Sequence, residues 1–106
     1  MDLGRIQNVS RLGAGFLQDV RSWIWMPTRV EFELSTDGEN FARVLSIPND
    51  VPDNSYDVVV RDFVRAIPAR QVRYVRVKAY NYGTIPSWHP GHGGRAWIFI
   101  DEIIIP

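Results

Sequence analysis

The sequence lacks cysteine and long apolar runs, and it contains a single lysine and two histidines. Without cysteine, a disulfide framework and thiolate metal sites are excluded. No apolar stretch approaches the roughly 20 residues that a membrane-spanning helix needs, so no transmembrane segment is expected. The opening residues, Met-Asp-Leu-Gly-Arg, are not typical of a signal peptide, so an export signal is expected only on a longer parent chain.

An excess of charge of one sign is also missing, because 12 basic and 12 acidic residues give a formal net charge of zero. A neutral chain has no bulk attraction for nucleic acid or for anionic membranes, and we expect no nucleic-acid partner. The length of 106 residues and the 45% hydrophobic content predict one domain over residues 1–106 with a single core.

Apolar and polar side chains alternate along several stretches, which is the period of a strand with one buried face. Val30, Phe32 and Leu34 alternate with charged residues in this way, and no stretch shows helical periodicity over three turns. Asp37-Gly38 predicts a hairpin turn. These patterns predict an all-β antiparallel sandwich or jelly roll. The expected strands are residues 6–11, 29–35, 42–47, 56–62, 71–80 and 96–105.

Two of these stretches carry a further signal. Residues 96–105 are apolar at both parities, which predicts a strand that is covered on both faces. The outward face of 71–80 interleaves basic and aromatic side chains: Tyr74, Arg76, Lys78 and Tyr80. Such a face can clamp single-stranded nucleic acid, or its basic groups can pair across strands with Glu31 and Glu33. The zero net charge favours cross-strand pairing.

Long loops at the ends of a β-scaffold often carry function, and two are expected here, 15–27 and 81–97. Between them they hold all four tryptophans: Trp23, Trp25, Trp88 and Trp97. Indole rings in polar loops need cover, which comes from the domain itself, from the apolar C–H face of a sugar or from another protein. Trp97 begins the last expected strand, so we expect it to be internal. For Trp23, Trp25 and Trp88, cover from the domain itself and cover from a ligand or partner both stay open.

The residues do not predict catalysis. Asp101 and Glu102 are adjacent, so on a strand their side chains leave opposite faces and cannot act as a pair. No Gly-x-Ser-x-Gly motif is present. His89 and His92 are separated by Pro-Gly and supply at most half of a tetrahedral metal site, so we expect them to shape the loop or to contact a sugar.

A pair of glycines in Gly13-Ala14-Gly15 resembles the start of a phosphate-binding turn. The dinucleotide motif needs a third glycine where this chain has Gln18, and no βαβ pattern follows. We therefore expect a bulge or a sharp turn at this place.

Four segments in this order resemble one family: "GFLQD", "STDGENF", "RYVRVKAYNYG" and "WHPGHGGRAWIFIDEI". The last is the most specific. Together they are similar to the discoidin-like domain (coagulation factor five/eight type C) at the C-terminus of glycoside hydrolase family 20 enzymes, the β-N-acetylhexosaminidases that include putative chitobiases. The resemblance runs over nearly the whole chain.

The resemblance implies a galactose-binding-domain-like jelly roll with ligand loops at one end. It implies a non-catalytic accessory module of an exported enzyme, periplasmic or extracellular, that acts on glycans containing N-acetylhexosamine or galactose. Members of the family usually have two or more strands before the segment that matches Asp2, so the chain is expected to be N-terminally truncated. A structural calcium ion is common in the family. Glu102 falls on a ligand position, but the N-terminal loop that completes the site has no match here.

The leading expectation is therefore carbohydrate binding through the tryptophan-rich end loops. The candidate ligand-binding residues are Trp23, Trp25, Asn81, Trp88, His89, His92 and Arg95. One alternative is a structural module that docks onto the catalytic domain of the same polypeptide through the apolar segment "WIWMP". Another is a membrane or cell-surface adhesion module in which Trp23 and Trp25 insert at the interface.

Overall fold

The computed structural model describes residues 1–105, and its strands confirm the predicted all-β class. The strands form one antiparallel sheet in the order β3-β2-β4-β1-β5. No helix among the described residues is long and apolar enough to cross a membrane. The elements are β1 (Asp2–Gln18), the short 3-10 turn η1 (Val20–Ser22), β2 (Arg29–Ser35), β3 (Ala42–Pro48), β4 (Val59–Tyr80) and β5 (Phe99–Ile104).

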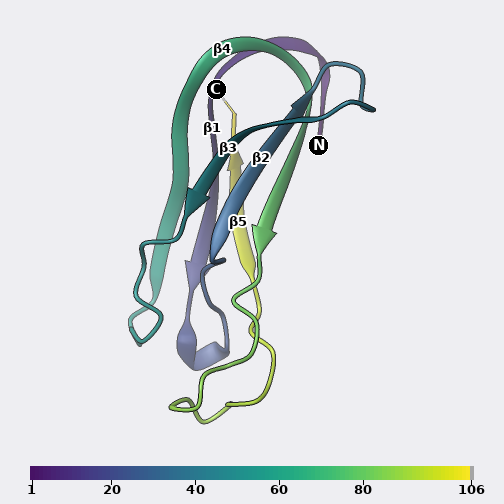
Figure 1. The fold of residues 1–106 in the computed structure, drawn as a ribbon. Coiled ribbons are helices and arrows are strands. Elements are labelled where there is room, and N and C mark those ends of the chain that lie inside the picture. The colour runs from purple at the N-terminus through teal and green to yellow at the C-terminus, as the bar shows by residue number, and fades with distance from the viewer. Residues whose placement is uncertain (106) are drawn as a thin grey trace.

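The two longest strands, β1 and β4, have 17 and 22 residues and bend over at one end of the molecule (Figure 1). At the bend, β4 residues 67–69 lie opposite Ser10 of β1, where the register shifts. Such a bulge bends both strands. Residues in it lie outside the regular ladder of hydrogen bonds, so Pro68, which has no N–H to donate, is tolerated there. The sheet therefore folds over on itself, which is consistent with the predicted sandwich, whereas the jelly-roll topology stays a prediction.

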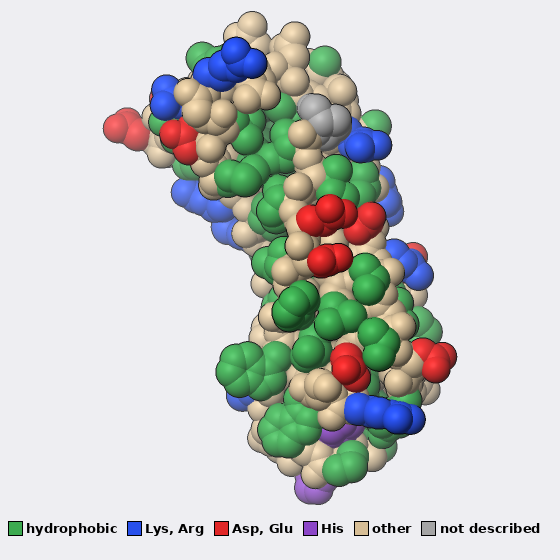
Figure 2. Space-filling view, turned by 180° about the vertical axis from the view of Figure 1, so that it is seen from behind, with side chains coloured by type: hydrophobic (Ala, Val, Ile, Leu, Met, Phe, Trp, Pro, Cys, Tyr) green, Lys and Arg blue, Asp and Glu red, His purple; other side chains and the backbone are tan. Residues whose placement is uncertain are grey.

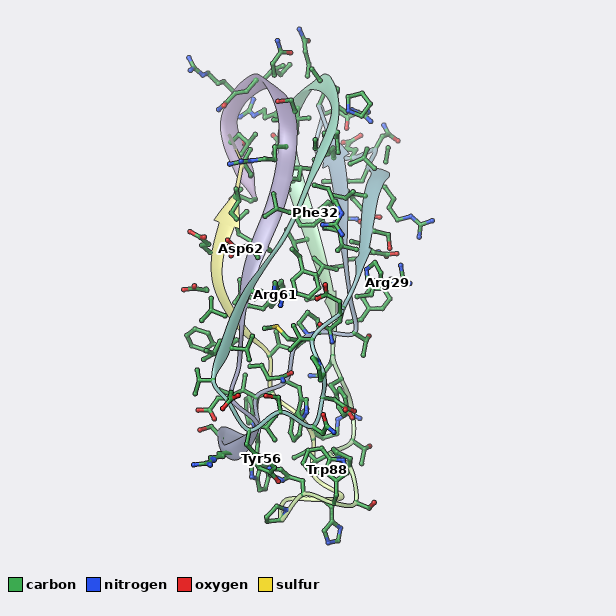
Figure 3. All side chains as sticks on the ribbon, turned by 90° about the vertical axis from the view of Figure 1, so that its left-hand side faces the viewer. Arg29, Phe32, Tyr56, Arg61, Asp62 and Trp88 are labelled. Atoms are coloured by element: carbon green, nitrogen blue, oxygen red, sulfur yellow. The ribbon has the colours of Figure 1, made fainter. Side chains whose placement is uncertain are left out.

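One layer contains β5, the second half of β1 and the first half of β4. The other contains β3, β2, the second half of β4 and the first half of β1. The core lies between them. Phe16 and Phe63 come from the first layer, with their rings edge-on at 5.4 Å. Val30, Phe32 and Val72 come from the second, and all five side chains are buried. Figure 3 places Phe32 between the layers.

The expected strand boundaries differ from the observed ones mainly at the bend. The stretches 56–62 and 71–80 were expected as two strands, but most of both belongs to β4. Likewise, 6–11 is only part of β1. The gap between the two expected strands contains Pro68, which in the structure lies at a bend within one strand.

The cross-strand pairing predicted for the outward face of β4 is confirmed. The guanidinium of Arg76 lies 3.2 Å from a carboxylate oxygen of Glu33, and the ammonium of Lys78 lies 3.6 Å from the same oxygen. The phenol of Tyr80 donates a hydrogen bond to Glu31, which lowers the pKa of the Glu31 carboxyl and raises that of the tyrosine. Arg76, Lys78 and Tyr80 thus bind acidic side chains of the neighbouring strand β2.

The predicted hairpin between β2 and β3 is also confirmed. Gly38 adopts φ 80° in the connection, a conformation that favours glycine. The carboxylate of Asp37 accepts hydrogen bonds from the backbone N–H groups of Glu39 and Asn40 and from the Ser35 hydroxyl. The carboxylate therefore closes the turn by satisfying its backbone donors.

Of the bulge or sharp turn expected at Gly13-Ala14-Gly15, the structure shows the bulge and not the turn, because all three residues lie within β1 between β4 and β5. A bulge does follow, where the β1–β5 register shifts between Gly15 and Phe16. A Cβ on Gly13 would come within 2.5 Å of the Val64 side chain, and one on Gly15 within 2.9 Å of the Asp62 carboxylate. A larger residue at Gly13 would therefore displace the Val64 side chain, whereas at Gly15 the end of the Asp62 side chain would have to move.

Two burial predictions near the C-terminus are wrong. The stretch 96–105 was expected to be covered on both faces, but β5 is an edge strand on which Phe99 is 51% and Ile100 is 48% exposed. Trp97 was expected to be internal and is 67% exposed. The apolar pattern is real, but among residues 1–105 no strand pairs with the outer edge of β5.

Candidate functional site

Three connections meet at the end of the molecule opposite the bend: residues 19–27, 49–58 and 81–98 (Figure 1). We call this region the aromatic end, because it contains Trp23, Trp25, Tyr56, Tyr82, Trp88 and His89. Backbone hydrogen bonds join two of the connections. The Trp25 N–H donates to the Trp97 carbonyl at 3.1 Å, and the Trp97 N–H donates to the Trp23 carbonyl at 2.9 Å.

Trp25 is the centre of a small second core at this end. Its side chain is only 1% exposed and packs with Val20, Ile85 and Ala96. Its ring N–H donates to the carbonyl of Asp53 at 2.9 Å, so the buried polar atom is satisfied. The Tyr82 ring stacks on it at 5.3 Å. Trp25 therefore holds the connections together and has no free face for a ligand.

The Tyr82 phenol is also tied to the connection that carries Asp53. It donates to the Asp53 carboxylate at 2.6 Å. Because this carboxylate accepts from the protonated phenol, it raises the pKa of Tyr82 to about 12. Asp53 thus contacts the aromatic end twice, through its backbone carbonyl and through its carboxylate.

His89 is buried, at 3% exposure, and links two of the connections. Its Nε2 lies 2.8 Å from the carbonyl oxygen of Val20, and its Nδ1 accepts the N–H of Gly91 at 2.9 Å. A carbonyl only accepts, so the proton resides on Nε2 and the imidazole is neutral. Both ring nitrogens are thereby occupied, which leaves His89 a loop-shaping role rather than contact with a sugar or a metal.

Three aromatic rings of this end are partly open to solvent. Trp23, Tyr56 and Trp88 are 41%, 42% and 44% exposed. The Trp88 and Tyr56 rings meet edge-on at 5.8 Å, and Figure 3 shows both at the same end. The buried His89 ring lies 5.9 Å from Trp88 and 6.5 Å from Trp23. The exposed rings thus rest on a rigid, buried support.

The position of Trp23 depends on the glycines of the "HPGHGG" segment. A Cβ on Gly91 would lie 2.6 Å from the indole ring of Trp23, and one on Gly94 would lie 3.2 Å from it. Trp23 itself has φ 68°, which is rare for a non-glycine residue. Its indole therefore packs directly on a glycine-rich surface that no larger residue can provide.

The predicted polar residues fall into different environments. The side chain of Asn81 stabilises a turn. Its amide donates to the Ala96 carbonyl at 3.1 Å, and its oxygen accepts the Gly83 N–H at 2.7 Å. His92 and Arg95 are exposed in the same connection. Glu102 lies apart from all of them on β5, opposite Gly15 of β1.

The calcium position that the resemblance assigns to Glu102 has little support nearby. Among residues 1–105, no three His, Asp or Glu side chains converge as a metal site would require. Calcium also takes backbone carbonyls and waters among its six to eight oxygen ligands, so a calcium ion at Glu102 stays a prediction of the resemblance.

Sequence reasoning missed Tyr56 and Asp53, which the structure brings to the aromatic end. The signal for Tyr56 was available. It is an aromatic residue within the polar loop "SIPNDVPDNSY", so the criterion that singled out the tryptophans applies to it equally. Asp53 carried no such signal, because its contacts depend on which connections meet in space.

Comparison with protein-family models gave no match, and comparison with curated proteins gave no significant match. The family resemblance therefore depends on the four quoted motifs alone.

Proposed function

We propose that this chain is a non-catalytic module that binds glycans through the exposed rings of the aromatic end. The observation that carries the proposal is the group of three half-exposed rings, Trp23, Tyr56 and Trp88, supported from beneath by Trp25 and His89. A soluble domain usually covers such rings, and pyranose sugars offer the apolar C–H faces that do so.

Trp88 is the proposed stacking platform. It is the most exposed of the three rings, and its edge-on contact with Tyr56 leaves indole surface free. Sugar hydroxyls need polar partners, which the exposed His92 and Arg95 of the same connection supply. The polar side-chain atoms of Asn81 and His89 form hydrogen bonds within the protein, so these residues support the site rather than contact the sugar.

The four sequence motifs extend the proposal to the ligand and its context. On that resemblance, the glycan contains N-acetylhexosamine or galactose, and the module accompanies the catalytic domain of an exported β-N-acetylhexosaminidase.

The alternatives of docking to a catalytic domain and of membrane insertion rest on an exposed "WIWMP" segment. Trp25 and Met26 are each 1% exposed and Trp23 is 41% exposed, so of these three residues Trp23 alone offers apolar surface to either alternative. Binding of the protein to anionic liposomes in a co-sedimentation assay would favour insertion through Trp23 over glycan binding.

The proposal is tested by titration with chitobiose, N-acetylgalactosamine and galactose, monitored by tryptophan fluorescence and NMR. We expect saturable binding of one of them with a Kd of about 1 mM, or roughly −4 kcal/mol. Trp88→Ala should abolish it. Trp97→Ala is the matched control, because Trp97 is exposed but makes no aromatic contact with this end. If no sugar produces a response at about 10 mM, or if both variants lose binding equally, the proposal fails.

A further inference from the structure

The outer edge of β5 is open along its length. Among residues 1–105, β5 is the last strand of the sheet and pairs only with β1. Edge strands are usually protected by charged side chains, above all lysine, by proline, by bulges or by a covering loop, because their free N–H and C=O groups invite another strand. β5 has no lysine or proline. Its charged residues are Asp101 and Glu102, next to the bulge in its pairing with β1, and all residues from Phe99 to Ile103 are exposed.

The inward side chains of β5 are also left without cover. Ile100 pairs with Phe16 and Ile103 with Ala14, and both β1 partners are 0% exposed. Directly paired residues point to the same face of a sheet. Ile100 and Ile103 therefore face the inter-layer space, yet they are 48% and 37% exposed.

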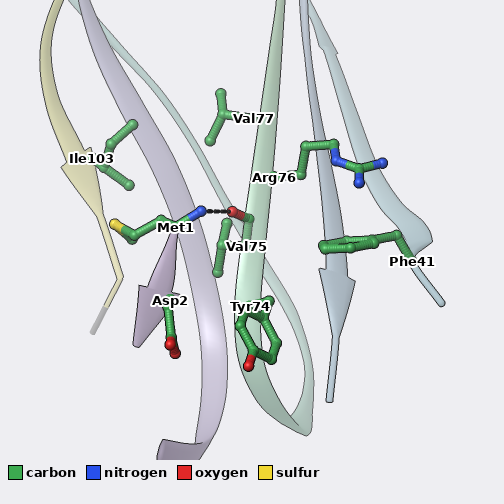
Figure 4. Close-up of a pocket in the computed structure, with 8 residues that line it drawn as sticks. All are labelled: Met1, Asp2, Phe41, Tyr74, Val75, Arg76, Val77 and Ile103. Atoms are coloured by element: carbon green, nitrogen blue, oxygen red, sulfur yellow. Dashed lines mark hydrogen bonds between the residues drawn. The ribbon is translucent and has the colours of Figure 1, made fainter. Parts of the chain in front are cut away.

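A cavity of about 500 Å³ lies beside this uncovered surface (Figure 4). Ile103 of β5 forms one wall, and Val75 and Val77 of β4 form the wall opposite. The N-terminal residue Met1 closes one side by hydrogen bonding to the backbone of Val75. Phe41, Tyr74 and Arg76 also line the cavity, which extends from Ile103 towards β4 beside the place where the inward side chains of an added strand would lie.

The charge of β5 restricts what can pair with it. Asp101 and Glu102 lie in its middle, and Asp62 lies opposite Gly15 across the sheet. No basic side chain of the described residues forms an ion pair with these three acids. In Figure 2, acidic side chains form a group at mid-height with hydrophobic side chains above and below.

This charge argues against a second copy as the occupant. Two β5 strands paired antiparallel about their middle would place Asp101 opposite Glu102 twice, and like charges directly opposite are destabilising. A strand with lysine or arginine at its centre and apolar residues on either side has the complementary pattern.

We propose that β5 accepts an extended segment of another polypeptide by strand addition. The segment pairs with the free edge, places apolar side chains over Ile100 and Ile103, and sets adjacent basic side chains at the level of Asp101 and Glu102. Main-chain hydrogen bonds supply affinity in this mode of recognition, and the side chains supply specificity. The proposal does not depend on glycan binding at the aromatic end.

The test uses the peptide acetyl-TVVKRVVT-amide with the ¹⁵N-labelled chain. We expect chemical-shift changes and slower amide hydrogen exchange at Phe99–Ile104. The matched peptide acetyl-TVVEEVVT-amide should bind several-fold more weakly, and a version of the first peptide with N-methylated backbone amides should not bind. The isosteric variant Asp101→Asn/Glu102→Gln should reduce the difference between the two charged peptides.

Three results would overturn the proposal. The first is the absence of shifts at β5 with about 1 mM peptide, a concentration that detects binding of roughly −4 kcal/mol. The second is equal binding of the basic and the N-methylated peptides. The third is a stable dimer of the chain at neutral pH without peptide, seen by sedimentation and lost on Ile103→Lys, which would make a second copy the occupant.

Discussion

Single side chains at the aromatic end act by joining backbone segments that are far apart in the sequence. His89 is the clearest case, since its two ring nitrogens contact the carbonyl of Val20 and the N–H of Gly91. A buried carbonyl that loses its donor costs free energy, because no water replaces the bond.

We therefore expect His89→Ala to lower the free energy of unfolding by about 1–3 kcal/mol. The melting temperature should fall by roughly 4–8 °C per kcal/mol in a domain of this size. The control is His92→Ala, because His92 is exposed and its side chain makes no such link. Equal melting temperatures for the two variants would contradict the structural role of His89.

Tyr82 provides a pH-dependent link at the same end. Its pKa is raised from 10.0 to about 12 by the hydrogen bond to Asp53, so the link stabilises the fold fully below pH 10. That stabilisation is lost as the pH rises from 10 to about 12.

Tyr82→Phe should therefore destabilise the protein at neutral pH, and the difference from the wild type should shrink above pH 10. Absorbance at the phenolate band should also lose its component that titrates near 12. A variant that titrates in the same way as the wild type would show that the raised pKa belongs to another tyrosine.

Among the connecting segments, the glycine-rich turn is built around the indole of Trp23. Gly91→Ala would place a methyl group 2.6 Å from that ring, so the ring or the turn must move. We expect a loss of about 1–3 kcal/mol and a shift in tryptophan emission.

The double variant Trp23→Ala/Gly91→Ala separates this contact from a backbone effect. Because the clash needs both side chains, the loss in the double variant should be smaller than the sum of the two single losses. Additive losses would mean that Gly91 is required for its backbone alone.

The β2–β3 hairpin depends on one ionised carboxylate. Hydrogen bonds from Asn40, Glu39 and Ser35 hold the pKa of Asp37 well below its ordinary value of 3.8. A depressed carboxyl pKa contributes stability that is present above the unfolded value and is lost as the pH falls through the folded one.

Asp37→Ala should accordingly lower the melting temperature at neutral pH and have less effect at strongly acidic pH. Glu39→Ala is the control, because Glu39 enters the network only through its backbone N–H. An effect of Asp37→Ala that does not change with pH would show that the carboxylate charge is not what closes the turn.

The shape of the domain follows from two strands that each run through both layers. Because β1 and β4 continue across the bend, neither layer can lose its strands without disturbing the other. This continuity predicts a single cooperative unfolding transition.

Phe16→Ala, at a fully buried position between the layers, should cost about 3–5 kcal/mol. Fluorescence from the aromatic end and circular dichroism from the sheet should shift together to the lower midpoint. Two separate midpoints would indicate that the aromatic end unfolds independently of the sheet.

Much of the fold is readable from local chemistry. Alternation such as that of Val30, Phe32 and Leu34 identifies strands, and Asp37-Gly38 identifies the hairpin, since both depend on neighbours along the chain. The pairing of β4 basic residues with Glu33 was also predictable, because opposite charges on adjacent strands attract.

The candidate site was predicted less well, because burial depends on contacts between distant segments. Trp23, Trp25 and Trp97 are joined by backbone hydrogen bonds and look alike in the sequence, yet Trp25 is buried and the other two are exposed. Local composition thus predicted strands, a turn and aromatic loops. The bend at Ser10, the burial of Trp25 and His89 and the open edge of β5 arose only once those parts packed together, since each depends on which segments meet in space.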